Sequence, residues 1–417
     1  MDLERILLEV LLDISLVILA ASAISPLCSR VRQPAVVGLL LLGLLVGLLP
    51  HGVSTALFPT DARPFLDVVA QIALVLFLFT MGYELDLRAV RRNARNVVAV
   101  AFGATVVPLA LGAVFGLSLL GSGLSARTRG GPGSFVLFMA ISLSITALPV
   151  LSWILMDRRI VATRPGVVAL AASGLMDMVM WPLLIMVIAL STADNGKLIT
   201  ALLFLPVYAV VMIFVVRPLL RRMMRGRYRL QSVSPVIIAL LMASAWATGR
   251  LGLHVFLGAL LMGAITPRGE DGAVDAELLN AVDRAGTALL PVFFVVTGLT
   301  VQLNGLHAAD WPVALAACAL ATLGKFGGGS VAGRLGGLDA RTSLITGVLV
   351  NTRGLTELIA LSAAWQAGML GSRLYTVLVV MALVTTAMTG PLLSLLKMDG
   401  PSPDAARRGL VTSGSVR

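Results

Sequence analysis

Charged side chains are scarce in this 417-residue sequence: Asp, Glu, Lys and Arg make up 13%, about half the share of a typical soluble protein. Cysteine and histidine are scarcer still, with 2 and 3 residues. Cys28 and Cys318 lie far apart in apolar surroundings, which argues against a disulfide framework, a cysteine-bound metal and redox chemistry. The apolar stretches contain no Ser/His/Asp set and no paired catalytic carboxylates, so an enzyme is the least supported class and no cofactor is expected.

Hydrophobic residues are abundant, at 58% with a mean hydropathy of +0.96, which excludes a soluble protein. No polar stretch between the apolar runs is long enough for a soluble domain of ordinary size. Windows near the ~20 residues that cross a bilayer as a helix predict an all-α integral membrane protein. About 13 transmembrane helices are predicted, at 6–27, 34–50, 64–83, 96–120, 134–156, 165–191, 198–217, 232–249, 251–267, 286–303, 311–333, 341–366 and 373–396.

The basic residues predict the orientation of these spans. Loops on one side carry 23 Lys and Arg and loops on the other side carry 7, while Lys325 and Arg353 lie inside spans. Cytoplasmic loops are enriched in Lys and Arg, so we expect a multi-pass protein, in the plasma membrane, with its N-terminus outside and its C-terminus in the cytoplasm. This bias also explains the net charge of +11 without any nucleic-acid partner.

The two halves of the chain resemble each other. The segment from Phe77 to Leu87 matches Phe293 to Leu303 at an offset of 216 residues, and two glycines near residue 40 match Gly258 and Gly263 at an offset of 220. We predict repeat one at about 6–191, a linker helix at about 198–217, repeat two at about 232–397 and a short polar cytoplasmic tail at 398–417. An odd linker helix makes the repeats inverted, which is typical of secondary transporters.

Asp177 is the most informative polar residue, because it lies about a dozen residues into a span and no other ionisable residue occurs between Arg164 and Asp194. A charge at the centre of a membrane helix costs about 2.5–3.5 kcal/mol on insertion scales, so it requires a reason. A carboxylate there can hold a cation when ionised and a proton when neutral. The alternative is a structural carboxylate that caps a neighbouring helix or pairs permanently with Lys325.

Two spans in corresponding places of the halves carry helix-breaking residues, Pro149 and Gly354. The hydroxyls and amide beside the breaks, on Ser144, Thr146 and Asn351, are candidate ligands of a transported cation. The charges there, Arg353 and Glu357, lie one turn apart and can compensate the exposed half-helix ends or each other, and a structural role is as well supported as a transport role. Lys325 is either a counter-charge for the carboxylate site or a side chain that snorkels to the inner interface.

Seven segments along the chain form an ordered set: Arg32–Gly38, Phe77–Leu87, Ser144–Val150, Asp177–Trp181, His254–Gly258, Leu290–Gly298 and Asn351–Leu358. In this order they resemble the motifs of the monovalent cation:proton antiporter-2 family, the sodium/hydrogen exchanger domain, over about residues 6–397. The resemblance implies the sodium-proton antiporter fold, with two inverted repeats, crossed broken helices, a separate dimerisation domain and an elevator-like movement.

The sequence departs from the family pattern in two places. Family members usually carry a polar residue before the site aspartate, whereas this chain has Met176, so Lys325 stays unpaired, pairs with Asp177 or is neutral. Many relatives also append a nucleotide-binding regulatory domain, whereas only twenty residues follow Lys397, so we expect no such regulation in cis.

The sequence therefore predicts a secondary active antiporter that exchanges a monovalent cation, Na⁺ or K⁺, for H⁺ at Asp177, working as a homodimer in the lipid bilayer. The transported cation is the only metal expected there. Two alternatives stay open: a degenerate, non-transporting sensor or scaffold, suggested by Met176, and a proton-coupled exporter of a small organic solute that reuses the fold.

Overall fold

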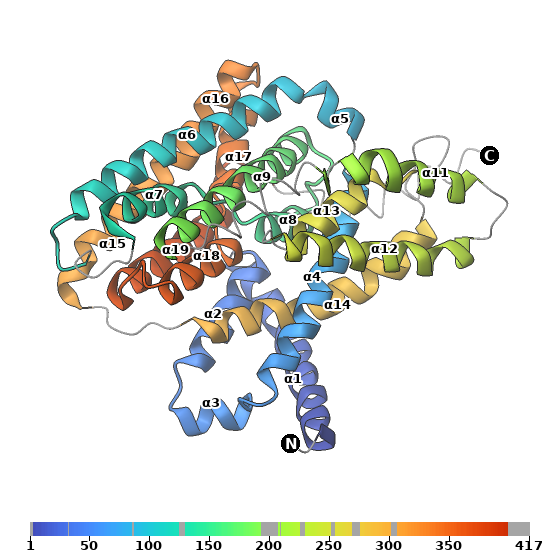
Figure 1. Cartoon of the computed structure of the whole chain (residues 1–417), viewed down its shortest axis with the longest axis horizontal. Coiled ribbons are helices and arrows are strands. Elements are labelled where there is room, and N and C mark those ends of the chain that lie inside the picture. Colours follow the sequence, from blue (N-terminus) through green and yellow to red (C-terminus); the bar gives the residue numbers. More distant parts are fainter. Residues whose placement is uncertain are drawn as a thin grey trace.

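The computed structural model describes residues 3–31, 33–85, 87–124, 130–192, 207–208, 210–225, 230–251, 255–268, 276–301 and 307–398, and within these ranges the regular structure is helical (Figure 1). The helices of the first half are α1 (Leu3–Arg30), α2 (Ala35–Gly47), α3 (His51–Leu57), α4 (Arg63–Glu84), α5 (Leu87–Arg92), α6 (Ala94–Leu119), α7 (Gly131–Ser144), α8 (Leu148–Asp157) and α9 (Arg164–Thr192). Those that follow are η1 (Met212–Val216), α11 (Arg217–Arg225), α12 (Leu230–Arg250), α13 (Val255–Ile265), α14 (Ala276–Thr300), η2 (Ala308–Asp310), α15 (Trp311–Thr322), η3 (Leu323–Gly327), α16 (Gly328–Gly336), α17 (Ala340–Val350), α18 (Leu355–Gln366) and α19 (Ser372–Leu395).

The prediction of an all-helical, multi-pass membrane protein is confirmed. Eight helical segments of the described residues are long and apolar enough to cross a membrane, and four shorter apolar helices accompany them. Each predicted span falls on one to three consecutive helical elements, three in the case of 311–333, except the linker helix at 198–217. Residues 198–206 and 209 of that linker, and residues 399–417 of the predicted tail, lie outside the described residues. The largest difference in bounds is at α14, which begins at Ala276 rather than near residue 286.

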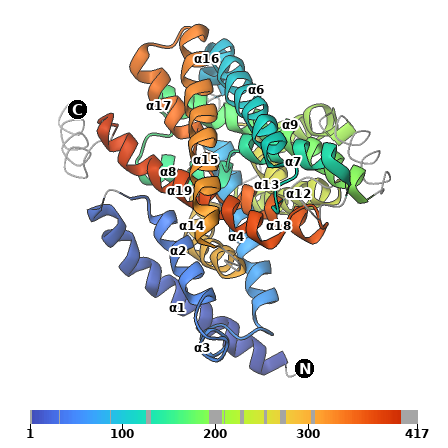
Figure 2. The ribbon, with the colours of Figure 1, turned by 90° about the vertical axis from the view of Figure 1, so that its left-hand side faces the viewer.

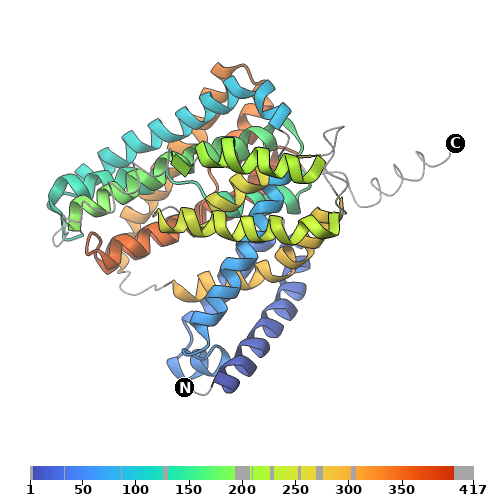
Figure 3. The ribbon, with the colours of Figure 1, turned by 45° about the vertical axis from the view of Figure 1, so that its right-hand side comes forward.

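The helices form two groups (Figures 1 and 2). In one group α6 packs on α7, α9 and α16, while α19 packs on α15 and α18. In the other, α4 is flanked by α13 and α14, α2 packs on α14, and α12 packs on α13 (Figure 3). The first group contains both interrupted spans and therefore the polar residues singled out from the sequence.

Four glycines let the halves of the chain pack directly against each other. A methyl group built on any of them would fall within 2.4 Å of a carbonyl oxygen on the facing helix: Gly43 on Val295, Gly263 on Phe79, Gly82 on Leu260 and Gly298 on Leu40. The contacts are two-fold related, since Val295 follows Phe79 by 216 residues and Leu260 follows Leu40 by 220, the offsets of the sequence repeat. Each repeat thus packs two helices against the other repeat, α2 on α14 and α4 on α13. The boundaries of the repeats stay a prediction.

We expect Gly82→Ala and Gly263→Ala each to destabilise the protein by about 1–3 kcal/mol, because the new methyl group meets backbone atoms that cannot move aside. Gly133→Ala is the matched control: Gly133 lies in α7 with no neighbour within 4 Å, so alanine is tolerated there. Thermal stability of the detergent-solubilised variants is the measurement. Equal melting temperatures for all three variants would contradict the close approach.

Candidate functional site

The two interrupted spans are broken helices, as predicted. α7 ends at Ser144 and α8 begins at Leu148, while α17 ends at Val350 and α18 begins at Leu355. Pro149 lies in the first turn of α8, where its missing N–H leaves no helical bond unmade. Gly354 precedes α18 with φ +137°, a conformation that side chains rarely adopt.

Each break supplies hydrogen-bond partners to the other. The Ala147 N–H donates to the Thr352 carbonyl at 3.1 Å. The Thr146 hydroxyl donates to the Val350 carbonyl at 3.3 Å, and the Thr356 hydroxyl donates to the Thr146 carbonyl at 2.9 Å. Backbone groups freed inside a membrane have no water to bond, so these contacts are what makes the interruption tolerable.

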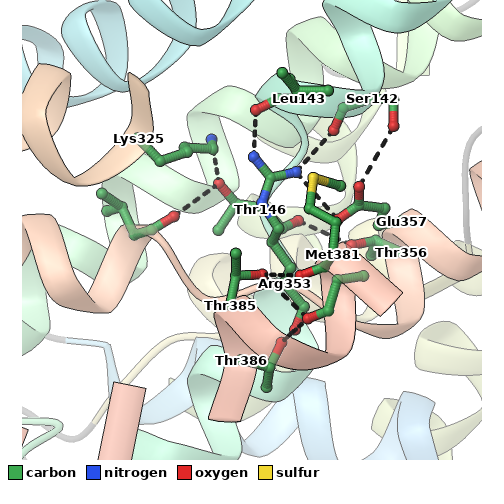
Figure 4. A network of polar contacts seen from close by, with 12 residues as sticks. Ser142, Leu143, Thr146, Lys325, Arg353, Thr356, Glu357, Met381, Thr385 and Thr386 are labelled. Atoms are coloured by element: carbon green, nitrogen blue, oxygen red, sulfur yellow. Dashed lines mark hydrogen bonds and ion pairs between the residues drawn. The ribbon is translucent and has the colours of Figure 1, made fainter. Parts of the chain in front are cut away.

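Arg353 and Glu357 join the crossing as a buried ion pair (Figure 4). The Arg353 Nη1 lies 3.1 Å from Glu357 Oε2, and both side chains are fully buried. The guanidinium also donates to the Ser142 carbonyl at 2.8 Å and to the Leu143 carbonyl, at the C-terminal end of α7. Ser142 Oγ lies 3.4 Å from Glu357 Oε1. Arg353 therefore compensates both the C-terminal end of α7 and the Glu357 carboxylate, the two forms of charge compensation considered from the sequence.

Asp177 lies in α9 and is fully buried. Neither carboxylate oxygen accepts a hydrogen bond from the described residues, nor does the Ser173 hydroxyl one turn earlier have a partner there. The side chain before Asp177 reaches the first break, since Met176 Sδ lies 4.0 Å from the Thr146 hydroxyl. Buried carboxylates are almost always hydrogen-bonded, so two open oxygens beside a helix break leave ligand positions available.

Lys325 lies on η3, a π-helical turn between α15 and α16, and is fully buried. Its Nζ donates to the Thr146 hydroxyl at 2.5 Å and lies 3.5 Å from Met176 Sδ. The snorkelling interpretation is wrong, because these acceptors hold the ammonium inside the helix group rather than at the interface. The described contacts include no hydrogen bond between Lys325 and Asp177.

The other two predicted ligands, Asn351 and Ser144, differ in their hydrogen bonds. Asn351 is buried at the second break, with no partner for its Oδ1 among the described residues. Ser144 is also buried, but its hydroxyl donates to the Thr105 carbonyl on α6 at 3.1 Å. Sequence reasoning missed Thr356 and Thr386, whose hydroxyls bond carbonyls of the breaks. Threonines are common in membrane helices, so only a comparison of the two repeats could have drawn attention to them.

Crossed helix breaks beside a buried carboxylate, in a two-fold related set of membrane helices, define a transporter rather than an enzyme. The chain belongs to the sodium/hydrogen exchanger family, since the family model described as "Sodium/hydrogen exchanger, transmembrane" matches residues 16–397.

Two curated proteins illustrate the relationship. The Na⁺/H⁺ antiporter NhaS4 of Synechocystis sp. is 32% identical over 94% of this chain and 98% of its own length. The K⁺/H⁺ antiporter 1 of Saccharomyces cerevisiae is 29% identical over 95% of this chain but 47% of its own length, so the chain spans about half of that relative.

Among solved structures, the sodium proton antiporter MjNhaP1 from Methanocaldococcus jannaschii superposes with a TM-score of 0.64 over 92% of this chain and 94% of that one, at 16% identity. This likeness confirms the predicted antiporter fold.

We expect Arg353→Gln to destabilise the protein by about 3–5 kcal/mol, because Glu357 is then left buried without its partner. The double variant Arg353→Gln/Glu357→Gln recovers part of this loss, since no unpaired charge remains, although the α7 carbonyls stay uncapped. Thermal unfolding of both variants and of Glu357→Gln completes the double-mutant cycle. Additive losses would mean that the two side chains are not coupled.

Proposed function

We propose that the protein is a secondary antiporter that exchanges a monovalent cation, Na⁺ or K⁺, for H⁺ by alternating access, with Asp177 as the shared site. The observation that carries the proposal is a fully buried carboxylate whose two oxygens have no partner among the described residues. A bound proton and a bound cation each neutralise that carboxylate. Because they exclude each other, a movement that carries the site across the membrane exchanges one for the other.

The first break supplies further oxygens, and Met176, the residue before Asp177, reaches it. The Thr146 hydroxyl lies there between the Lys325 ammonium and the Val350 carbonyl. Asn351 Oδ1 and Ser144 Oγ are the further oxygens of the proposed cation site, although Ser144 is bonded to α6. The names of the relatives support a monovalent cation as the exchanged ion, and they include both Na⁺/H⁺ and K⁺/H⁺ antiporters.

Met176 favours a second candidate, a relative that has lost transport and acts as a sensor or scaffold. Its thioether stands next to Asp177 and within 3.5 Å of the Lys325 Nζ, in a position where a polar residue is usual in the family. An exporter of a small organic solute is the third candidate. Purified protein in liposomes with an internal pH dye separates them: Na⁺, K⁺ or Li⁺ must release protons if the first candidate is correct, and none does so for the other two.

We further propose that the N-terminus lies outside and the C-terminus in the cytoplasm, that the membrane is the plasma membrane, and that the protein works as a homodimer. The distribution of 23 basic residues against 7 over the loops supports the orientation.

We expect Asp177→Asn to reduce cation-driven proton release to the level of empty liposomes, because an amide cannot alternate between a proton and a cation. The control is Asp67→Asn, which removes an exposed carboxylate on α4 and should keep the wild-type rate. Proteoliposome assays at matched protein density give the rates. Wild-type exchange by the Asp177→Asn variant would remove Asp177 from the mechanism.

The charges at the crossing bear on stoichiometry. Asp177, Glu357, Lys325 and Arg353 are each fully buried, and in their ordinary charge states they form a set with no net charge. One proton or one monovalent cation on Asp177 adds the same single positive charge. We take Lys325 to keep one protonation state throughout the cycle, with its Nζ donating to the Thr146 hydroxyl and lying 3.5 Å from Met176 Sδ. We therefore infer a one-for-one, electroneutral exchange.

We expect the exchange rate to be independent of a membrane potential clamped with valinomycin, at fixed ion gradients, in wild type and in Lys325→Gln. The reason is that both half-cycles move the same charge. A potential dependence that is present in wild type and absent in Lys325→Gln would instead identify Lys325 as a second proton carrier.

A further inference from the structure

The repeat relation extends to the helices that follow the breaks. α9 contains Pro182 followed by two leucines, and α19 contains Pro391 followed by two leucines, 209 residues later. At this offset Asp177 corresponds to Thr386. Both side chains are buried, and each lies on a helix that packs against the broken helix of its own half.

Thr386 bonds the second break directly. Its Oγ1 lies 2.7 Å from the Arg353 carbonyl and 2.7 Å from the Ala382 carbonyl of its own helix, and its one proton serves these two acceptors. Arg353 precedes Gly354, the N-cap of α18, so its carbonyl lies outside the helical hydrogen-bond ladder. The Thr386 hydroxyl is the donor that the described structure supplies to it.

Through Arg353, the Thr386 hydroxyl is linked to the end of α7 on the other side of the crossing. Arg353 is held by Thr386 at its backbone, and its guanidinium holds the Ser142 and Leu143 carbonyls at the end of α7. Thr146, a proposed oxygen ligand of the cation, follows three residues after Leu143. A shift of Arg353 would therefore move the end of α7 and the break that carries Thr146.

We propose that Thr386 is a positioning residue for the exchange, an inference that rests on the proposed function: its hydroxyl fixes the second break and so keeps the cation ligands of the first break in place. In this proposal the two corresponding residues have different roles. A threonine hydroxyl keeps its proton at all working pH values, so the second break is held constantly. The corresponding residue of the first repeat is Asp177, which can release its proton to a cation.

The neighbouring Thr385 provides a matched control. It is fully buried on the same helix, but among the described residues its hydroxyl bonds only the Met381 and Ala382 carbonyls of α19, at 2.8 and 3.1 Å (Figure 4). Thr385→Val therefore removes the same chemical group without touching the break. Thr386→Ser keeps the donor and should rescue whatever Thr386→Val loses.

The experiment has two measurements on these variants. The first is amide hydrogen exchange of residues 351–358 in the detergent-solubilised protein, read by mass spectrometry. Because Thr386→Val leaves a buried carbonyl without its donor, we expect about tenfold faster exchange there. The second is the apparent KM for the cation in proteoliposomes, which we also expect to rise about tenfold. Thr386→Ser and Thr385→Val should stay within about twofold of wild type in both.

The outcomes separate the two levels of the proposal. Unchanged hydrogen exchange in Thr386→Val, or an equal increase in Thr385→Val, overturns the positioning of the break. Faster hydrogen exchange with an unchanged KM overturns its link to the ion site and leaves a purely structural bond. A wild-type protein that exchanges no cation overturns the proposed function, while the hydrogen-exchange result still decides the positioning. If Thr386→Val does not fold, Thr386→Cys, a weaker donor, replaces it.

Discussion

The structure depends on one constraint: inside a membrane, every backbone polar group must find its partner within the protein. Interrupting a helix there frees amides and carbonyls, and this chain satisfies many of them by crossing two interruptions. The Ala147 amide bonds the Thr352 carbonyl, Thr146 and Thr356 bond across the crossing, and Arg353 bonds the end of α7. Each break obtains these hydrogen-bond partners from the other break, so the site requires both halves of the chain.

The same crossing gathers charge where charge is expensive. Two acidic and two basic side chains are fully buried there, and within this set of four the ion pair that the described structure shows is between Arg353 and Glu357. Lys325 is hydrogen-bonded to the Thr146 hydroxyl rather than to Asp177, and its Nζ lies 3.5 Å from Met176 Sδ. Asp177 is left with two oxygens that have no partner among the described residues, and the proposed competition between a proton and a cation rests on these oxygens.

Much of the architecture could be predicted from the sequence because the bilayer restricts the choices. Long apolar runs have to be helices, and the offsets of 216 and 220 residues reappear as two-fold related contacts of Gly43, Gly82, Gly263 and Gly298. A charge inside a membrane span costs free energy and therefore requires a structural or functional role, which drew attention to Asp177, Lys325, Arg353 and Glu357. Hydropathy could not predict the direction in which a flexible side chain points. Lys325 is the example, because its stem is long enough for the ammonium to reach either the membrane interface or the protein interior.

The sequence by itself determined the helical class, the span positions, the internal repeat, the locations of both breaks and the identity of the buried carboxylate, because hydropathy, proline and glycine act locally along the chain. Only the tertiary structure decided which groups meet. It bonds Lys325 to Thr146, turns Ser144 towards α6 and brings Thr386 to the Arg353 carbonyl. These contacts join residues 33 to 179 positions apart, and hydrogen bonds at such separations follow from the packing of helices, which local patterns do not specify.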